Sequence, residues 1–407
     1  MKKLLIFIVG LPQILFAGGF QLNVQNSTQL GMGGAGTALF PNASVLFANP
    51  GAMCFLKKSI ATINFSTIFP STVYVSTLYN SETVYADAQV FTPFSAFAVY
   101  KKSDTAKWAA GVGVYTPFGS GVRWPDDWPG NNVLREIYLQ TIFYQPTFSY
   151  QINQNFGAGF GFVYGTGSML LRQGLPLYDS LSKQGSAELN GKATGIGYNL
   201  GMEYRVSARL QFGFNFRSGM TLRTTKTSAE FSTPSALNDS FPSTTFDAEI
   251  KLPAIIQIGG SVLIGRKFLI AADLQFSNWH VYDSLFFDYA ANNSLLEDTR
   301  LARNYINTFT TRIGFQFSAN RNIQLRAGGY IDQTPVQDGF VSPDLPDATR
   351  YSFSTGFTIQ LNNKFDIDGA YEYVHTPERN GIYSEMGLAG IYRTNVAIAN
   401  IGLTYRF

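Results

Sequence analysis

The sequence predicts an all-β protein, a transmembrane antiparallel β-barrel of about 14 strands with an N-terminal hatch of short helices plugging the lumen. Apolar and polar residues alternate in segment after segment, and the connections between these segments alternate between short and long. The chain ends in a strand with one unbroken apolar face that finishes on the aromatic Phe407. Alternation of this kind is typical of strands that separate lipid from a polar lumen.

The composition agrees with a barrel. The 407 residues suffice for one large barrel or for two soluble domains, and only 14% of them are charged, whereas 15% are aromatic. After residue 17 no apolar run approaches the roughly 20 residues that a membrane-spanning helix needs. A net charge of +3 argues against nucleic acid as a partner. Two histidines and one cysteine, Cys54, leave little material for a metal site, so we expect no metal and no cofactor.

Residues 1–17 read as a secretory signal peptide. Lys2 and Lys3 supply the positive start, residues 4–16 form a short apolar core, and Ala17 is a suitable residue before the cleavage site. A short buried helix is the alternative interpretation.

Residues 18–58 differ from the rest of the chain and are expected to form the hatch. The run Gly-Met-Gly-Gly-Ala-Gly at residues 31–36, and then Asn49, Pro50 and Gly51, interrupt any long helix or strand. A compact segment of short helices and turns follows from this composition, and its size suits a plug.

Residues 59–407 are expected to form the barrel. In the last strand Phe407, Leu403 and Ile401 lie on one face, and Thr404 and Asn400 lie on the other. A slip of one residue would move charges into lipid, so the register is strongly specified.

The connections between strands predict the layout of an outer-membrane barrel, with short turns at one rim and long loops at the other. Short turns are expected near residues 151–155, 206–209, 265–267, 319–322 and 362–364. Long loops are expected near residues 120–136, 173–188, 223–247, 284–303, 332–350 and 375–393. With a hairpin between residues 60 and 100, the count is about fourteen strands, an even number as in bacterial barrels. A stack of soluble β-domains would not explain this alternation of short and long connections.

Several side chains could carry chemistry. Asp366, Asp368 and Glu372 share one face of a strand, where they are expected to pair with inward basic residues; Ca²⁺ binding is the alternative. His280 and His375 could serve a membrane-bound hydrolase, but no serine stands in a nucleophile-type turn near either.

Two stretches resemble the long-chain fatty-acid outer-membrane transporter family (FadL/TodX type). The first runs Arg-Ala-Gly-Gly-Tyr-Ile-Asp-Gln-Thr-Pro-Val from residue 326, followed by Leu-Pro-Asp at 345–347 and by Arg350. The second comprises Lys-Leu-Pro at 251–253 and Ala-Asp-Leu-Gln-Phe-Ser-Asn-Trp at 272–279. The start Gly-Phe-Gln-Leu-Asn at 19–23, Asn49-Pro50 and Tyr-Thr-Pro-Phe-Gly at 115–119 are also similar to the family, so the resemblance covers essentially the whole mature chain.

The resemblance implies a 14-stranded barrel with a hatch, a lumen site for hydrophobic molecules, and sideways exit into the membrane through a gap in the wall. Sideways exit keeps an apolar solute out of water, which avoids a cost of roughly 0.8 kcal/mol per exposed CH₂ group. The chain departs from the family at Gly51, where relatives have Ala, and this change is expected to alter the rigidity of the hatch. It also departs at residues 285–287, Leu-Phe-Phe, where relatives can offer a basic residue, which leaves neutral hydrocarbons open as substrates.

The resemblance also implies site residues. Arg350 is placed among the ligand-binding positions, where a guanidinium can hold a carboxylate with two hydrogen bonds; the alternative is an ion pair with Asp347 or Asp344. Arg172 and Arg217 are expected to assist Arg350, and Phe20 is expected to reach the lumen site. Asn49, Pro50 and Gly51 are expected to act as the hatch gate.

The leading interpretation is passive uptake of hydrophobic molecules, above all long-chain fatty acids, across the outer membrane of a bacterium. The expected partners are the hydrophobic ligand, outer-membrane lipid, and the barrel-assembly machinery, which would bind the C-terminal strand. A hydrocarbon channel of the same fold, an outer-membrane lipase, a non-specific porin and a receptor for phage or adhesion are the alternatives.

Overall fold

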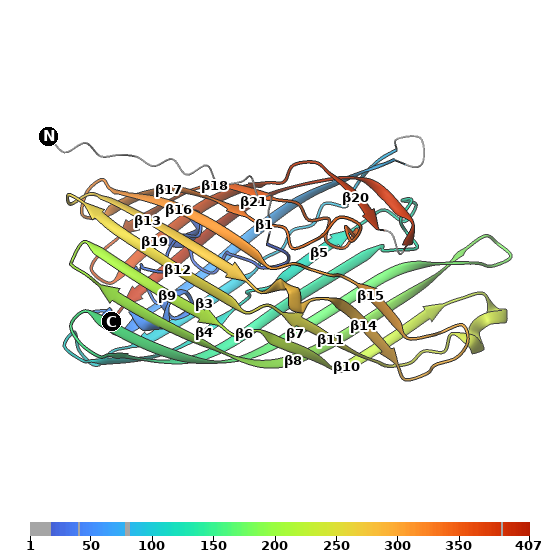
Figure 1. The fold of residues 1–407 in the computed structure, drawn as a ribbon, viewed down its shortest axis with the longest axis horizontal. Coiled ribbons are helices and arrows are strands. Elements are labelled where there is room, and N and C mark those ends of the chain that lie inside the picture. Colours follow the sequence, from blue (N-terminus) through green and yellow to red (C-terminus); the bar gives the residue numbers. More distant parts are fainter. Residues whose placement is uncertain (1–17, 40, 78–81, 384–385) are drawn as a thin grey trace.

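The alternation in the sequence becomes a closed ring of antiparallel strands (Figure 1). The computed structural model describes residues 18–39, 41–77, 82–383 and 386–407, so the expected signal peptide lies outside the described residues. In the described part the strands are β1 (Ile60–Ser76), β2 (Thr83–Tyr85), β3 (Phe94–Tyr100), β4 (Trp108–Tyr115), β5 (Gly119–Arg123), β6 (Glu136–Gln151), β7 (Phe156–Tyr178), β8 (Gln184–Arg205), β9 (Leu210–Arg217), β10 (Met220–Ser232), β11 (Phe246–Leu252), β12 (Ile255–Ile264), β13 (Phe268–Ser277), β14 (Ser284–Tyr289), β15 (Thr299–Ala302), β16 (Thr308–Ser318), β17 (Ile323–Asp332), β18 (Arg350–Gln360), β19 (Phe365–His375), β20 (Arg379–Tyr383) and β21 (Leu388–Arg406).

These segments build a barrel of fourteen strands, which confirms the prediction. A barrel strand that crosses the wall, whether unbroken or made of two of these segments, is called a stave below. Seven staves are unbroken, namely β1, β6, β7, β8, β17, β18 and β21. The other seven are each interrupted once, and their two halves pair with the same neighbouring staves: β2 with β3, β4 with β5, β9 with β10, β11 with β12, β13 with β14, β15 with β16, and β19 with β20. An interruption leaves the ring closed but weakens the ladder at that height.

The first and last strands close the barrel. Their register runs from Ile60 opposite Arg406 to Ser76 opposite Gly390. In β21 the predicted faces are confirmed, because Ile401 and Phe407 are exposed, whereas Asn400 and Thr404 are buried. The short turns were also placed correctly; for example, β12 ends at Ile264 and β13 begins at Phe268.

The long loops were predicted wrongly in part. Residues 173–188, 223–247, 284–303 and 375–393 were expected as loops, but most of the first range and about half of the others belong to strands β7, β8, β10, β11, β14, β15, β20 and β21. The ends of β7, β8 and β10 reach well beyond most of the barrel in Figure 1. In the extensions of β8, β10 and β11 the outward side chains are polar, so the lipid-facing pattern is lost, but inward side chains such as Leu222 and Ile250 remain apolar and buried. Burial of that inner face favours continued strand pairing outside the membrane.

The hatch lies inside the barrel and is almost entirely buried (Figure 1). It contains α1 (Ser27–Leu30), α2 (Val45–Ala48) and the 3₁₀ helix η1 (Pro50–Phe55). Asn26 caps α1, because its side-chain oxygen accepts a hydrogen bond from the Thr28 amide at 2.8 Å. Among the described residues no helix is both long and apolar enough to cross a membrane.

The interior has two layers. Around the hatch the inward side chains are polar: Asp366 pairs with Arg406, and Asp368 lies 3.8 Å from Arg326. Asp366 and Asp368 thus pair with basic residues as predicted, whereas Glu372 accepts a hydrogen bond from the Tyr330 hydroxyl at 2.9 Å and forms no ion pair within the described residues. A continuous apolar cluster rich in aromatic rings fills the long-strand end of the interior and extends to the hatch, where Leu46 and Met53 belong to it. The candidate site lies where the two layers meet.

Candidate functional site

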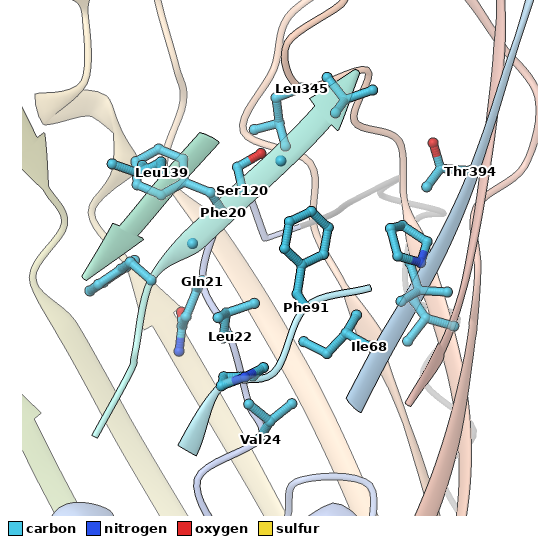
Figure 2. A pocket seen from close by; sticks show the side chains of 18 of the residues that line it. Phe20, Gln21, Leu22, Val24, Ile68, Phe91, Ser120, Leu139, Leu345 and Thr394 are labelled. Atoms are coloured by element: carbon cyan, nitrogen blue, oxygen red, sulfur yellow. The ribbon is translucent and has the colours of Figure 1, made fainter. Parts of the chain in front are cut away.

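A cavity of about 510 Å³ lies between the start of the hatch and the barrel wall (Figure 2). Phe20, Leu22, Phe91 and Leu345 all line it, and they come from the hatch, the wall and the loop before β18. Further apolar lining comes from Val24, Ile68, Val90, Phe118, Leu139, Val374, Val396 and Ile398. The volume falls in the range of about 300–1,000 Å³ that is usual for small-molecule sites.

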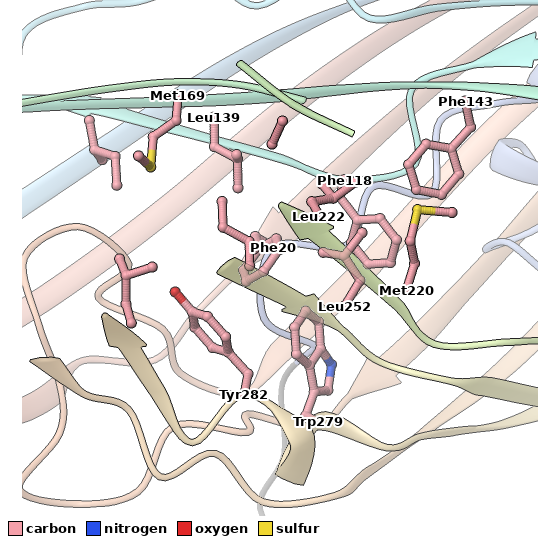
Figure 3. Close-up of a cluster of buried hydrophobic side chains, with 14 of the residues drawn as sticks. Phe20, Phe118, Leu139, Phe143, Met169, Met220, Leu222, Leu252, Trp279 and Tyr282 are labelled. Carbon is pink, nitrogen blue, oxygen red and sulfur yellow. The ribbon is translucent and has the colours of Figure 1, made fainter. Parts of the chain in front are cut away.

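Phe20 occupies the centre of an aromatic cluster (Figure 3). The centroid of its ring lies 4.8 Å from that of Trp279, 5.6 Å from that of Tyr282 and 6.0 Å from that of Phe118. Gly19 must be a glycine here, because its φ is +63° and a Cβ atom would lie 2.7 Å from the Trp279 ring. This close approach places Phe20 at the cavity, as expected from the sequence.

Arg350 forms the polar end of the cavity. Its Nη2 atom donates to the carbonyl oxygen of Gly19 and to Asp347 Oδ1, the latter at 2.9 Å. Asp347 also accepts from the Gly19 amide at 3.3 Å and from the Thr334 hydroxyl at 3.0 Å. Arg350 therefore makes the ion pair with Asp347 that was the alternative in the sequence analysis, and the same pair holds the start of the hatch. Within the described part of the chain, Nε and Nη1 of Arg350 have no protein partner.

The loop at residues 333–349 covers the cavity and is held in place by two more arginines. Arg379 donates to the carbonyl oxygens of Asp347 and Val336, at 2.7 and 2.8 Å. Buried Arg303 pairs with Asp344 at 2.9 Å. Charged contacts thus fix the loop that covers the cavity.

The barrel wall is interrupted next to the cavity. The Thr116 hydroxyl donates to the Phe94 carbonyl oxygen at 3.3 Å, and the Asp87 amide donates to that of Arg123 at 2.8 Å. Between these two contacts no hydrogen bond joins residues 88–93 to residues 117–122 of the next stave, all of which the structure describes. Residues 91–93 bond to β1 instead, where Ile68 and Phe91 exchange amide hydrogen bonds at 2.8 and 3.1 Å. A gap in the ladder therefore borders the site.

Side chains and the hatch fill this gap. The Phe91 ring lies over Gly121, where a Cβ atom would be 2.4 Å from it. From the inside, the Leu22 amide donates to the Pro117 carbonyl oxygen at 2.9 Å, and the Gly119 amide donates to that of Phe20 at 3.0 Å. The segment that carries Phe20 thus bonds to the break between β4 and β5.

The hatch-gate residues form a tight contact with β8. The Asn49 side chain donates to the carbonyl oxygens of Thr37 and Met202 and to Glu203 Oε2, at 2.9, 3.0 and 3.0 Å. Pro50 begins η1, and a Cβ atom on Gly51 would lie 2.6 Å from the Met202 Cα. Gly51 therefore permits close approach of the hatch backbone to the β8 backbone, and the expected change in hatch rigidity stays a prediction.

Arg172 and Arg217 do not line this cavity, so the geometry does not support the expectation that they assist Arg350. Arg172 lies on the surface, where it pairs with Glu136 and Glu188 at 2.8 Å each. Arg217 lies under the hatch, with its guanidinium carbon 4.0 Å from the centroid of the Phe47 ring. The sequence does not specify which neighbours these long side chains will meet in the closed barrel.

Phe91 and Trp279 were missed as site residues. Trp279 was visible as part of the second family-like stretch, and its rigid aromatic ring was the signal available. Phe91 does not belong to a segment of alternating apolar and polar residues, because it lies in the irregular segment between β2 and β3. The Leu-Phe-Phe segment contributes to the apolar cluster instead of the cavity, since Leu285 and Phe287 are both buried there.

The two histidines lie apart from the cavity. His280 is exposed, and its backbone amide donates to Asn307 at 3.1 Å. The Nδ1 atom of His375 lies 2.8 Å from Asn395 Oδ1. Neither histidine has a serine hydroxyl among its hydrogen-bond partners in the described part of the chain.

A membrane barrel with a plugged lumen and an apolar interior site defines a class of outer-membrane proteins that transport hydrophobic molecules. The family model described as outer membrane protein transport protein (OMPP1/FadL/TodX) matches residues 8–407, and the chain belongs to this family. It is located in the outer membrane and takes part in the transport of hydrophobic compounds.

Individual relatives are distant in sequence but similar over nearly their whole length. The chain is 22% identical to the long-chain fatty acid transport protein of Salmonella typhi, with 88% of each chain covered. Among solved structures, a FadL homologue of Pseudomonas aeruginosa superposes with a TM-score of 0.84 at 21% identity, covering 96% of this chain and all of that one. The toluene transporter TbuX of Ralstonia pickettii superposes with a TM-score of 0.72 at 14% identity, covering 95% and 99%.

Proposed function

We propose that the chain takes up long-chain fatty acids by binding them in the cavity with the carboxylate at Arg350 and the acyl chain along the apolar lining. The observation that carries this proposal is the combination of a 510 Å³ apolar cavity with one cation at its edge. Nε and Nη1 of Arg350 are available for a carboxylate, while Nη2 stays on Asp347 and Gly19. The relatives named as long-chain fatty acid transport proteins support the same assignment.

The neighbouring acids weigh against very tight binding of an anion. Asp347 and Glu372 also line the cavity, and Glu372 is buried with Tyr330 as its hydrogen-bond donor at 2.9 Å. A neutral hydrocarbon would avoid this repulsion, which makes a hydrocarbon channel the second candidate. The toluene transporter among the structural neighbours is consistent with that candidate.

Exit is proposed to occur sideways, through the gap between residues 88–93 and 117–122. The cavity already reaches both segments. A ligand leaving there would pass from the apolar lining to lipid without crossing the polar layer around the hatch, so its CH₂ groups would stay out of water. This exit would require displacement of Phe91 and of the segment that carries Phe20.

Binding measurements on Arg350→Ala test the head-group assignment. Loss of a hydrogen bond to a charged group should weaken fatty-acid binding by about 1.5–3 kcal/mol. A neutral hydrocarbon of equal length should bind nearly as before, as judged by calorimetry with the purified barrel. Equal losses for both ligands, or none for either, would refute the head-group role.

Arg379→Ala is the matched control for this experiment. Arg379 holds the same loop but does not line the cavity. Its loss should loosen the lid and affect both ligands alike. If neutral ligands bind better than fatty acids to the parent protein, the hydrocarbon channel becomes the better assignment.

A further inference from the structure

Two lysines lie directly opposite each other on the outer face of the barrel. Lys192 of β8 pairs with Lys226 of β10 in the antiparallel register, and both side chains are exposed. Like charges in directly opposed positions destabilise a sheet. Within the described part of the chain, neither ammonium group has an ion pair or a hydrogen bond to protein.

The surrounding charges do not neutralise this pair. Arg223 is bound by Glu249 at 2.7 Å, and Lys251 is bound by Asp283 at 3.2 Å, so these bases already have partners. Asp247 on β11 is exposed but forms no ion pair with either lysine in the described structure, and it lies opposite another acid, Asp288. Binding of an anion from outside the chain would therefore relieve the repulsion between the two lysines.

The height of the lysines on the barrel indicates where that anion comes from. From Ile196 onward the outward side chains of β8 are apolar or aromatic and exposed, namely Ile196, Tyr198, Leu200, Met202 and Tyr204, and only Thr194 lies between them and Lys192. Lys192 is twelve residues from Tyr204 along the strand, and at about 3.4 Å per residue and a tilt of about 40° this distance corresponds to a height of about 31 Å. The lipid-facing band of such barrels is about 25 Å tall, so Lys192 lies a few ångströms beyond it, on the rim of the long strands.

We propose that Lys192 and Lys226 bind a phosphate group of an outer-leaflet glycolipid. A phosphate monoester carries enough negative charge and enough acceptor oxygens to bind both ammonium groups at once. Ser168 lies opposite Lys192 on β7, and Asn190 and Ser228 form the next outward pair. These three side chains make no hydrogen bond within the described chain, so their donors are available for the remaining phosphate oxygens.

Lipid retention by the full-length purified barrel tests this proposal. The probe is bisphosphorylated lipid A, compared with the same lipid after enzymatic removal of its phosphates, and bound lipid is measured by native mass spectrometry. Lys192→Gln with Lys226→Gln should reduce retention of the phosphorylated lipid by about fivefold for each lysine removed. The dephosphorylated lipid should bind equally weakly to parent and variant.

Lys57→Gln with Lys58→Gln is the matched control. These neighbouring lysines are equally exposed but stand just before β1, at the opposite rim. This variant loses the same two charges and should retain lipid like the parent, as should Lys192→Arg with Lys226→Arg. Equal retention by the two glutamine variants would overturn the proposal, as would complete displacement of the lipid by millimolar inorganic phosphate, which would indicate a site for free phosphate.

Discussion

At the scale of single residues, the hatch is held by a few buried hydrogen bonds. Asn49 bonds to Glu203 and to two carbonyl oxygens, and Asp273 accepts from the Gly36 and Thr37 amides at 2.8 and 2.9 Å. All of these groups are buried, so a lost partner leaves a polar atom unpaired in a dry environment, which is costly. Cys54 in η1 is a free cysteine and is fully buried, so the reaction of its thiol with a reagent reports movement of the hatch.

We expect Asn49→Ala to slow uptake without preventing folding, and to expose Cys54. Burial raises the pKa of the Cys54 thiol, so in the parent both access and thiolate content are low and reaction with a maleimide should be slow. Losing hydrogen bonds to a charged group costs about 1.5–3 kcal/mol, so the labelling rate should rise by about tenfold or more. Gly51→Ala should act in the same direction, because its Cβ atom would meet the β8 backbone.

Gly167→Ala is the control for the glycine substitution. It adds the same methyl group to a barrel strand, but the nearest atom, in a flexible Leu222 side chain, would be 3.3 Å away. Parent-like labelling and transport in both Asn49→Ala and Gly51→Ala would show that these residues do not control the hatch.

At the scale of elements, the interruptions of the staves decide where the wall can open. Proline and irregular backbone separate β4 from β5 and β2 from β3, and a stretch that donates no ladder hydrogen bonds cannot seal a wall by backbone pairing. Here the seal is the Phe91 ring against Gly121, which is a contact between side chain and backbone. Such a contact can open without unfolding a strand.

Phe91→Ala should therefore speed the release of bound ligand into lipid. With the ring removed, the step that opens the gap needs less rearrangement, so we expect the release rate into liposomes to increase severalfold in stopped-flow measurements. Phe315→Ala removes an exposed ring from the lipid face of β16, far along the ring of strands from the gap, and should leave the rate unchanged. An unchanged rate in Phe91→Ala would argue for exit elsewhere.

At the scale of the whole molecule, the barrel combines a polar plugged end with an apolar filled end. The polar layer holds the hatch by hydrogen bonds, and an apolar cluster rich in aromatic rings lies under the long strands. A hydrophobic ligand thus finds apolar surroundings on the side of the long strands and in the cavity, whereas the polar layer disfavours onward passage through the hatch. This asymmetry is consistent with capture on one side and exit through the wall.

Deletion of Phe407 should impair assembly more than stability. The side chain is 65% exposed on the lipid face and contacts the Tyr405 ring at 4.8 Å, so its removal disturbs little of the folded barrel. If the assembly machinery binds the C-terminal strand, as expected, the heat-modifiable folded form should decrease severalfold in cells. Barrel refolded in detergent should keep its thermal stability, and a parent-like yield in cells would argue against recognition of this residue.

The sequence by itself determined the number of staves, the faces of the strands, the position of the short turns and the plugged lumen. These properties follow from alternation with a period of two and from local breakers such as Pro50, which act over a few residues. Membership of the family was also readable, because the Asp-Gln-Thr-Pro stretch is specific. Through the family resemblance the sequence placed Arg350 and Phe20 at the lumen site and named Asp347 or Asp344 as an alternative partner of Arg350, but it gave no indication of the contact between Arg350 and Gly19.

Only the tertiary structure decided which residues meet. Arg350 and Gly19 are 331 residues apart in the chain, and the hydrogen bond between them exists only because barrel closure and hatch insertion bring them together. The same holds for Phe91 over Gly121 and for Lys192 opposite Lys226, which depend on an irregular segment and on a bulged register. Local patterns specify the face on which a side chain lies, whereas pairing across the lumen or between staves depends on the closed ring as a whole.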